Sequence, residues 1–151
     1  MNAEKADAAP RLNRKSSSKR HGFVEVAAAL IFRKGKLLIT QRQVDSHLGG
    51  LWEFPGGKRE PGESFEQCLV REIREELNVQ IAVGGLFEDV THAYDEKTVR
   101  LKFFICRLVG GEPQALGCTA LRWVQPPELA DFTFPAADAR LLEKLRTYTF
   151  P

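Results

Sequence analysis

The sequence of 151 residues predicts one α+β domain in which strands outnumber helices. Apolar residues make up 43% of the chain and charged residues 28%, which suits a single soluble domain with its own core. Several apolar runs have the length and alternation of strands. One segment, residues 65–77, instead repeats apolar side chains at helical spacing.

Residues 1–21 carry most of the basic excess. The formal net charge of +2 comes from 22 basic and 20 acidic side chains, and six of the basic ones lie in this segment beside two acids. The segment shows no apolar periodicity, so we expect a disordered basic tail ahead of a domain at residues 22–151. A nucleic-acid patch from Arg11 to Arg20 is the alternative, but we expect no stable nucleic-acid complex.

The cysteines and the hydropathy pattern indicate the compartment. Cys68, Cys106 and Cys118 are odd in number and widely spaced, which fits neither a disulfide framework nor a zinc site. The N-terminus lacks the apolar run of a secretion signal, and no stretch approaches the roughly 20 apolar residues that span a membrane. We therefore expect a cytoplasmic protein with no membrane partner.

The first half of the domain predicts a β-hairpin and then a special loop. The apolar run at residues 24–32 leads through a turn at residues 34–35 into a second strand at residues 36–40. A short apolar segment, residues 51–54, is stopped by residues 55–57, Pro-Gly-Gly. Proline removes a hydrogen-bond donor there and the glycines permit unusual dihedral angles.

The second half predicts a capped helix and further strands. Ser64 and Gln67 match the capping-box pattern at the start of a helix over residues 65–77. Period-two alternation predicts a strand over residues 98–108. Two further elements complete the pattern, a short strand at residues 121–124 and a helix over about residues 136–146.

Three glutamates of the predicted helix share one face. At about 100° per residue, Glu75 and Glu76 lie about 60° and about 40° to either side of Glu72. Two carboxylates about 6 Å apart repel by roughly 3 kcal/mol at an effective dielectric near 20, so this crowding predicts a bound cation. Hard carboxylate oxygens suit Mg²⁺, or alternatively Mn²⁺, and such a cation also binds the phosphate oxygens of a polyphosphate substrate.

A solvated surface helix, with Arg71 paired to Glu75 and Arg74 in water, is the alternative interpretation. The preceding loop favours a site instead. Its glycine-rich backbone can approach an ion or a phosphate closely, and it ends in another acid, Glu63.

These residues resemble the signature of the Nudix hydrolase family. Gly57, five residues, Glu63, seven residues and then the segment 71–76, Arg-Glu-Ile-Arg-Glu-Glu, match it. Asn78 stands where the signature has glycine, and because asparagine tolerates the left-handed conformation we expect the helix end to be preserved. The resemblance implies the Nudix fold, a mixed β-sheet sandwiched between α-helices with the signature as a loop-helix-loop. It also implies hydrolysis of a nucleoside diphosphate linked to another group.

Within this family the chain is similar to the MutT-type branch over residues 23–147. The segments Leu51–Lys58 and Phe134–Asp138 carry the similarity. It implies pyrophosphohydrolysis of nucleoside triphosphates, often oxidised or modified ones such as 8-oxo-dGTP, to monophosphate and pyrophosphate, as in nucleotide-pool sanitation. We expect a monomer or a homodimer.

The resemblance also implies roles for single residues. Metal ligands would be Glu72, Glu75, Glu76 and the backbone carbonyl of Gly56, with Glu63 supporting the cluster and Arg71 orienting the glutamates. Substrate contacts would come from Arg42 and Lys58 to phosphate, from Asp138 to the base and from Phe54 stacking on the base. The ordinary alternatives are a helix cap for Asp138, a core side chain for Phe54 and solvated charges for the two cations.

One position departs from the family pattern. Relatives carry a glutamate, as metal ligand or general base, where this chain has Gly117, and Glu112 is the only acid of that loop. Two rival functions remain, a hydrolase of another nucleoside diphosphate derivative and a non-catalytic base-recognition module like the C-terminal domain of adenine glycosylases. The full set of signature acids and the MutT-like C-terminal segment favour the triphosphate hydrolase.

Overall fold

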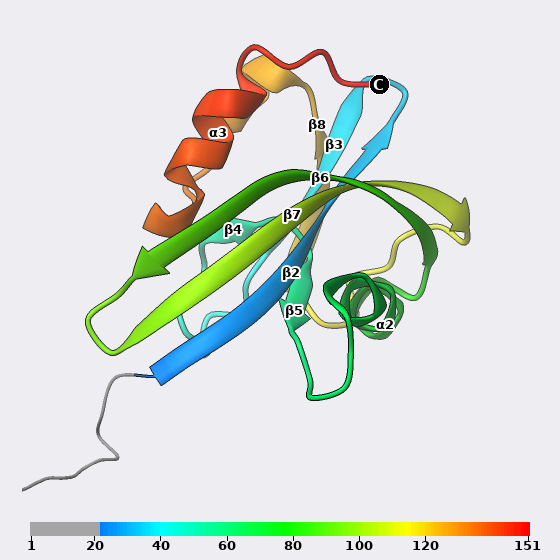
Figure 1. Cartoon of the computed structure of the whole chain (residues 1–151). Coiled ribbons are helices and arrows are strands. Elements are labelled where there is room, and N and C mark those ends of the chain that lie inside the picture. The colour runs from blue at the N-terminus through cyan, green and yellow to red at the C-terminus, as the bar shows by residue number, and fades with distance from the viewer. Residues whose placement is uncertain (1–21) are drawn as a thin grey trace, which may run out of the picture.

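The structure is a computed structural model that describes residues 22–151, so the predicted tail lies outside the described residues. A mixed sheet has one helix, α2, on one face and another, α3, on the other, which confirms the predicted α+β class (Figure 1). No helix among the described residues is long and apolar enough to cross a membrane. In chain order the elements are strands β2 (Gly22–Arg33), β3 (Lys36–Gln41), β4 (Trp52–Glu53) and β5 (Gly56–Lys58), helix α2 (Phe65–Leu77), strands β6 (Gln80–Ala93), β7 (Lys97–Gly110) and β8 (Ala120–Val124), the 3-10 helices η2 (Pro126–Asp131) and η3 (Ala136–Asp138), and helix α3 (Ala139–Leu145).

Strand β2 organises the sheet, whose main path runs β4-β3-β2-β7-β6. It pairs in parallel with β7 over ten residues of each strand, from Gly22 opposite Lys97 to Ile31 opposite Cys106. Its other partners, β3 and β5, are antiparallel, and β8 adds to the outer side of β3. The sheet is therefore mixed, and the predicted hairpin of β2 and β3 is confirmed.

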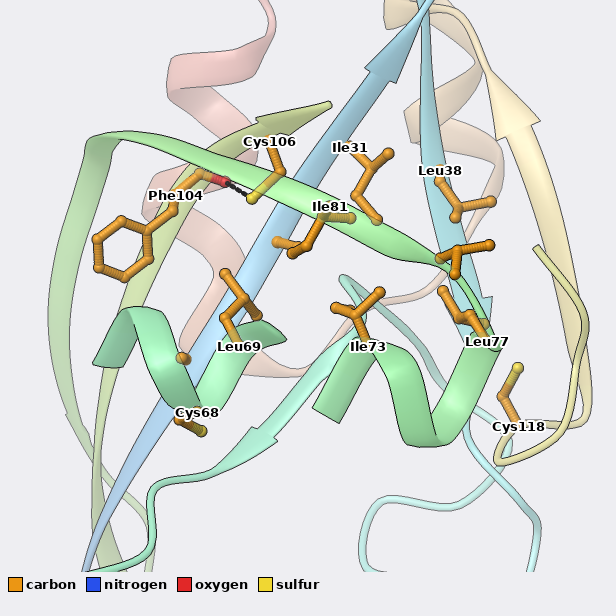
Figure 2. Close-up of a cluster of buried hydrophobic side chains, with 13 residues drawn as sticks. Ile31, Leu38, Cys68, Leu69, Ile73, Leu77, Ile81, Phe104, Cys106 and Cys118 are labelled. Carbon is orange, nitrogen blue, oxygen red and sulfur yellow. Dashed lines mark hydrogen bonds between the residues drawn. The ribbon is translucent and has the colours of Figure 1, made fainter. Parts of the chain in front are cut away.

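Each face of β2 packs a separate core, because successive side chains of a strand point to opposite faces. On one face Ile31 packs with Leu69 and Ile73 of α2 (Figure 2). On the other face Leu30 packs with Leu141 of α3. All five side chains are fully buried, so both helices are held against the sheet by apolar contact.

Helix α2 begins and ends as the sequence predicts. The Ser64 hydroxyl accepts from the Gln67 N–H at 3.0 Å, and the Gln67 side chain accepts from the Ser64 N–H at 2.9 Å. At the other end Asn78 adopts the left-handed conformation, with φ 56° and ψ 42°, and its N–H donates to the Arg74 carbonyl. The helix that carries the three glutamates is therefore fixed at both ends.

Two segments differ from the prediction. Residues 80–93, to which the sequence pattern assigned no element, form β6, where Gly84, Gly85 and shifts in register interrupt the alternation. Residues 56–58 form strand β5 rather than the start of a loop, and neither glycine has a positive φ. The predicted terminal helix is present but begins with a 3-10 turn before α3.

Candidate active site

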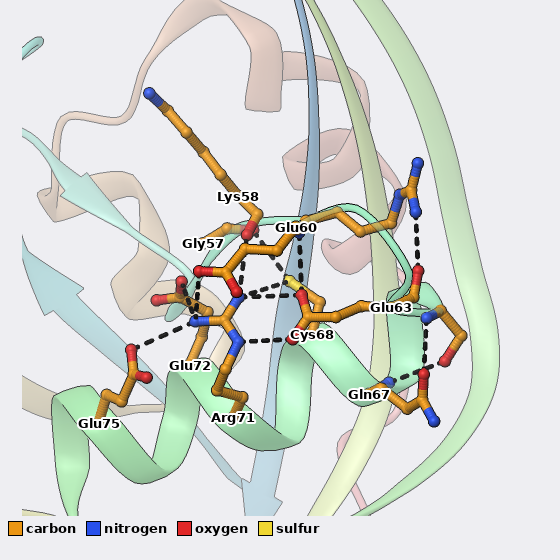
Figure 3. A network of polar contacts seen from close by, with 11 residues as sticks. Gly57, Lys58, Glu60, Glu63, Gln67, Cys68, Arg71, Glu72 and Glu75 are labelled. Carbon is orange, nitrogen blue, oxygen red and sulfur yellow. Dashed lines mark hydrogen bonds and ion pairs between the residues drawn. The ribbon is translucent and has the colours of Figure 1, made fainter.

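Arg71 connects two parts of the Nudix signature (Figure 3). One is the signature loop, residues 57–63, and the other is the glutamate face of α2, formed by Glu72, Glu75 and Glu76. Its Nε and Nη2 donate to the two carboxylate oxygens of Glu63 at 2.5 and 3.0 Å. Its Nη1 lies 3.0 Å from Glu72 Oε2 and 3.3 Å from Glu75 Oε1. A plain Arg71–Glu75 surface pair would explain only the last of these contacts. The arrangement is consistent with an orienting role for Arg71 and a supporting role for Glu63.

These contacts shift the pKa values of both partners. The hydrogen bond from Arg71, together with the Glu60 N–H, lowers the pKa of Glu63 to about 2. Hydrogen bonds to Glu63 and Glu72 raise the pKa of Arg71, although its partial burial acts in the opposite direction. The loop acid and its arginine are therefore both charged throughout the physiological pH range.

The three glutamates share a face, but their environments differ. Burial raises the pKa of Glu76 to about 8, and the charges of Glu53 and Glu72 add to the effect, whereas a backbone hydrogen bond from Gly56 opposes it. Burial also raises the pKa of Glu72. Glu75 has a side chain that is 57% exposed. Glu76 therefore marks the buried edge of this face and Glu75 its solvent edge.

The two glycines of β5 are required by space rather than by unusual dihedral angles. A Cβ on Gly56 would lie 2.0 Å from the Ala27 carbonyl oxygen on β2. A Cβ on Gly57 would lie 2.2 Å from Cδ of Glu72. The Glu72 carboxylate thus packs directly on the backbone of β5, beside the carbonyl predicted to bind metal.

The donor set suits a hard divalent cation. Three carboxylates and a backbone carbonyl offer only oxygen atoms, as Mg²⁺ and Mn²⁺ prefer. Within residues 22–151 no three His, Cys, Asp or Glu side chains already converge as a closed metal cage. Mg²⁺ needs no such cage, because it commonly takes one or two carboxylates and completes its shell with water and substrate oxygens. The residues present therefore fit the predicted metal.

A pocket opens beside β5 and extends to the start of α3. Apolar side chains of β2 and β7 form its floor, including Val26, Val99 and Leu101. Charged and aromatic groups surround this floor, a combination that suits a ligand with a flat ring and anionic groups. The polar and aromatic lining residues are Arg42, His47, Glu53, Phe54, Lys58, Tyr94, Lys97, Phe103 and Asp138.

Asp138 is a buried acid of this pocket rather than a helix cap. It is 4% exposed and precedes α3, but its side chain makes no capping hydrogen bond. The residue lines the pocket together with Glu53 and Tyr94. Burial first, and then the charge of Glu53, raise its pKa to about 7. This group is available to accept from a ligand when ionised and to donate when protonated.

The other predicted substrate residues also line the pocket. Arg42 is not a free charge, because its Nη1 lies 2.7 Å from Glu53 Oε1 and its Nε donates to the His47 carbonyl at 2.6 Å. Lys58 is exposed at the rim. Phe54 is 4% exposed and already stacks on Phe134, with ring centroids 5.1 Å apart. Phe54 is thus a core side chain that also contributes to the pocket wall.

Sequence reasoning missed four of the polar lining residues, Glu53, Tyr94, Lys97 and His47. Glu53 lines the pocket, and its charge adds to the effect of burial in raising the pKa of both Glu76 and Asp138. Tyr94 accepts from the Ala137 N–H at 3.3 Å, and Lys97 is a half-buried cation. Both flank the turn after β6, and without that strand no signal placed them. His47 lies in the loop between β3 and β4.

The loop before β8 supplies no acid to the glutamate face. The N–H groups of Leu116 and Gly117 both donate to the Glu76 carbonyl, and a Cβ on Gly117 would lie 3.0 Å from Glu76 Cγ. Glu112 pairs instead with Arg33 at 2.8 Å. Glu112 therefore does not replace the glutamate that relatives carry at position 117.

Known proteins resemble this chain in sequence and in fold. The NUDIX domain family matches residues 27–144. The chain is 41% identical to the CTP pyrophosphohydrolase of Escherichia coli (strain K12) over 121 residues, 80% of this chain and 90% of the relative. It is 31% identical to the 8-oxo-dGTP diphosphatase of the same strain over 124 residues, 82% and 96% of the two chains. The crystal structure of the MutT protein from Methanosarcina mazei Go1 superimposes with a TM-score of 0.74 at 26% identity, covering 83% of this chain and 94% of that one. The chain therefore belongs to the NUDIX domain family, as its signature predicts.

Proposed function

We propose that this protein is a Mg²⁺-dependent nucleoside triphosphate pyrophosphohydrolase of the MutT type. It converts oxidised or otherwise modified nucleotides, such as 8-oxo-dGTP, to monophosphate and pyrophosphate, and thereby cleans the nucleotide pool. The observation that carries the proposal is one pocket lined both by a buried acid, Asp138, and by Gly56 of the strand next to the three glutamates. The relatives named for CTP and 8-oxo-dGTP support a triphosphate substrate.

Each group in the site has a role in this proposal. Glu72, Glu75, Glu76 and the Gly56 carbonyl hold Mg²⁺, which when bound neutralises the charge that develops on the phosphate oxygens. Arg71 and Glu63 keep the glutamates in place. Arg42 and Lys58 contact the phosphates, since cationic donors suit phosphate oxygens. Asp138 binds the base, and the ring of Phe54 lies in the wall beside it.

Hydrolysis also needs a group that accepts the proton of the attacking water. The water oxygen forms a bond to phosphorus while the bond from that phosphorus to a bridging oxygen breaks, and the proton passes to a carboxylate. Among the described residues, the acids near the Gly56 end of the pocket are Glu53 and the three glutamates of α2, Glu72, Glu75 and Glu76. The proton acceptor is therefore one of these groups rather than Glu112.

The test is a Mg²⁺-dependent assay of pyrophosphate release over a panel of nucleotides ranked by kcat/KM. The panel contains 8-oxo-dGTP, dGTP, CTP and dCTP, with a nucleotide sugar and a dinucleotide for the rival hydrolase. We expect a triphosphate to rank first, and Glu75→Gln and Glu76→Gln to lower turnover by about 100-fold or more. Undiminished turnover by both variants would refute the metal site. Failure to hydrolyse any nucleotide with Mg²⁺ would instead favour the non-catalytic base-recognition module.

A further inference from the structure

The signature loop is tied to β2 by Arg59, a residue with no part in the function proposed above. The Arg59 N–H donates to the Glu25 carbonyl at 2.9 Å, which continues the β2–β5 pairing past Val26 opposite Lys58. Its guanidinium then binds the side chain of the same residue, with Nε at 2.9 Å and Nη2 at 2.5 Å from Glu25 Oε1. The two side chains are 29% and 24% exposed, so this ion pair is partly shielded from water.

The same guanidinium also reaches the start of α2. Its Nη1 donates to the Glu63 carbonyl at 2.7 Å. Its central carbon lies 5.5 Å from the ring centroid of Phe65, the first residue of the helix. Arg59 thus joins β2 to the main chain immediately before the helix cap.

Glu63 is consequently held from two sides. Arg59 binds its carbonyl. Arg71 binds its carboxylate and also contacts Glu72 and Glu75, as Figure 3 shows. A displacement of the Glu63 main chain would therefore move the carboxylate that positions Arg71. The contacts form one continuous chain, from Glu25 through Arg59, Glu63 and Arg71 to Glu72 and Glu75.

We propose that Arg59, held by Glu25, is a positioning residue for the metal site. It fixes Glu63, and through Glu63 and Arg71 it sets the geometry of the glutamate face. Arginine is required because one planar fork serves a carboxylate and a carbonyl at once, which the single ammonium of lysine cannot reproduce. The proposal rests on the metal site of the proposed function.

The test measures metal binding directly, without nucleotide or turnover. Mn²⁺ binding is followed by electron paramagnetic resonance in the full-length wild-type protein, in Arg59→Lys and in the double variant Arg59→Gln with Glu25→Gln. The lysine variant keeps the charge, and the double variant leaves no carboxylate unpaired. We expect both to bind Mn²⁺ about tenfold more weakly, as is typical when a group that supports metal ligands is lost. The Mg²⁺ concentration for half-maximal turnover should rise equally, with kcat at saturating Mg²⁺ retained.

Arg140 provides a matched control. Its Nε and Nη2 also bind one carboxylate oxygen, that of Glu88, at 2.8 and 2.6 Å, and Nη2 lies 3.3 Å from the Asp89 carbonyl. This pair joins α3 to β6 and does not touch the signature loop. Arg140→Lys should therefore bind Mn²⁺ as the wild type does.

The outcomes separate this inference from the proposed function. If Glu76→Gln binds Mn²⁺ as tightly as the wild type does, the metal site itself is wrong. If Glu76→Gln loses binding while both Arg59 variants keep wild-type affinity at temperatures where circular dichroism shows them folded, the positioning role is overturned. A lowered Tm with native Mn²⁺ affinity has the same meaning, because a purely structural ion pair predicts that result.

Discussion

Glu76 should destabilise the metal-free protein, and its replacement by glutamine reveals by how much. Burial raises its pKa from the ordinary value of 4.5 to about 8. The folded protein therefore keeps this proton up to about pH 8, whereas the unfolded chain releases it near pH 4.5. Between these values the folded state binds more protons than the unfolded state, so the free energy of unfolding falls as the pH rises.

The two pKa values set the size of the effect. By proton linkage, the raised pKa of Glu76 lowers the free energy of unfolding by about 1 kcal/mol at pH 5, about 3 kcal/mol at pH 7 and about 5 kcal/mol at pH 9. These are upper limits, because water that enters the site stabilises the ionised carboxylate. Glutamine has nearly the same shape and does not titrate. The stability advantage of Glu76→Gln over the wild type should therefore grow from pH 5 to pH 9.

The measurement is urea unfolding of both proteins at pH 5, 7 and 9, in chelator and at constant ionic strength. Glu143→Gln is the control, since the Glu143 side chain is 73% exposed and should show no such trend. An advantage that stays constant or shrinks as the pH rises would refute the reasoning. Adding Mg²⁺ should stabilise the wild type, increasingly so toward pH 8, but not Glu76→Gln, because a cation binds the ionised carboxylate.

Three further outcomes are expected. A methyl group in Gly57→Ala would meet the Glu72 carboxylate, so the Mg²⁺ concentration for half-maximal turnover should rise about tenfold. Gly85→Ala, with nothing within 4 Å of its Cβ, should match the wild type. In Asp138→Asn the kcat/KM ranking of bases should change and lose its pH dependence near pH 7, and an unaltered ranking at pH 6 and pH 8 would contradict base reading by this acid. Burial raises the pKa of the Cys68 thiol to about 11, of Cys106 to about 12 and of Cys118 to about 11, so all three should react with DTNB only on unfolding. Rapid labelling of the native protein would argue against their burial.

Features that depend on neighbouring residues could be predicted from the sequence. The cap of α2 at Ser64 and the left-handed end at Asn78 are set by interactions within one or two turns, and both are present. The strand β6 could not be predicted, because its glycines and bulges break the alternation and pairing with β7 supplies the order that the local pattern lacks. Tyr94 and Lys97 were missed with it, since they flank the turn that joins these two strands.

The acids of the site also depend on residues that are distant in the sequence. The family pattern suggests searching for the missing carboxylate at position 117, but there the chain places a glycine whose N–H binds the Glu76 carbonyl. A side chain at this position would press on Glu76 before it could add a charge to the site. The carboxylate whose charge acts on Glu76 is instead that of Glu53, which lies far from position 117 in the sequence. Glu53 is in β4, opposite Thr40 of β3. The pairing of β4 with β3 thus supplies a charge that acts on Glu76. A glycine at the position where a family motif has glutamate therefore does not show that the site lacks an additional carboxylate.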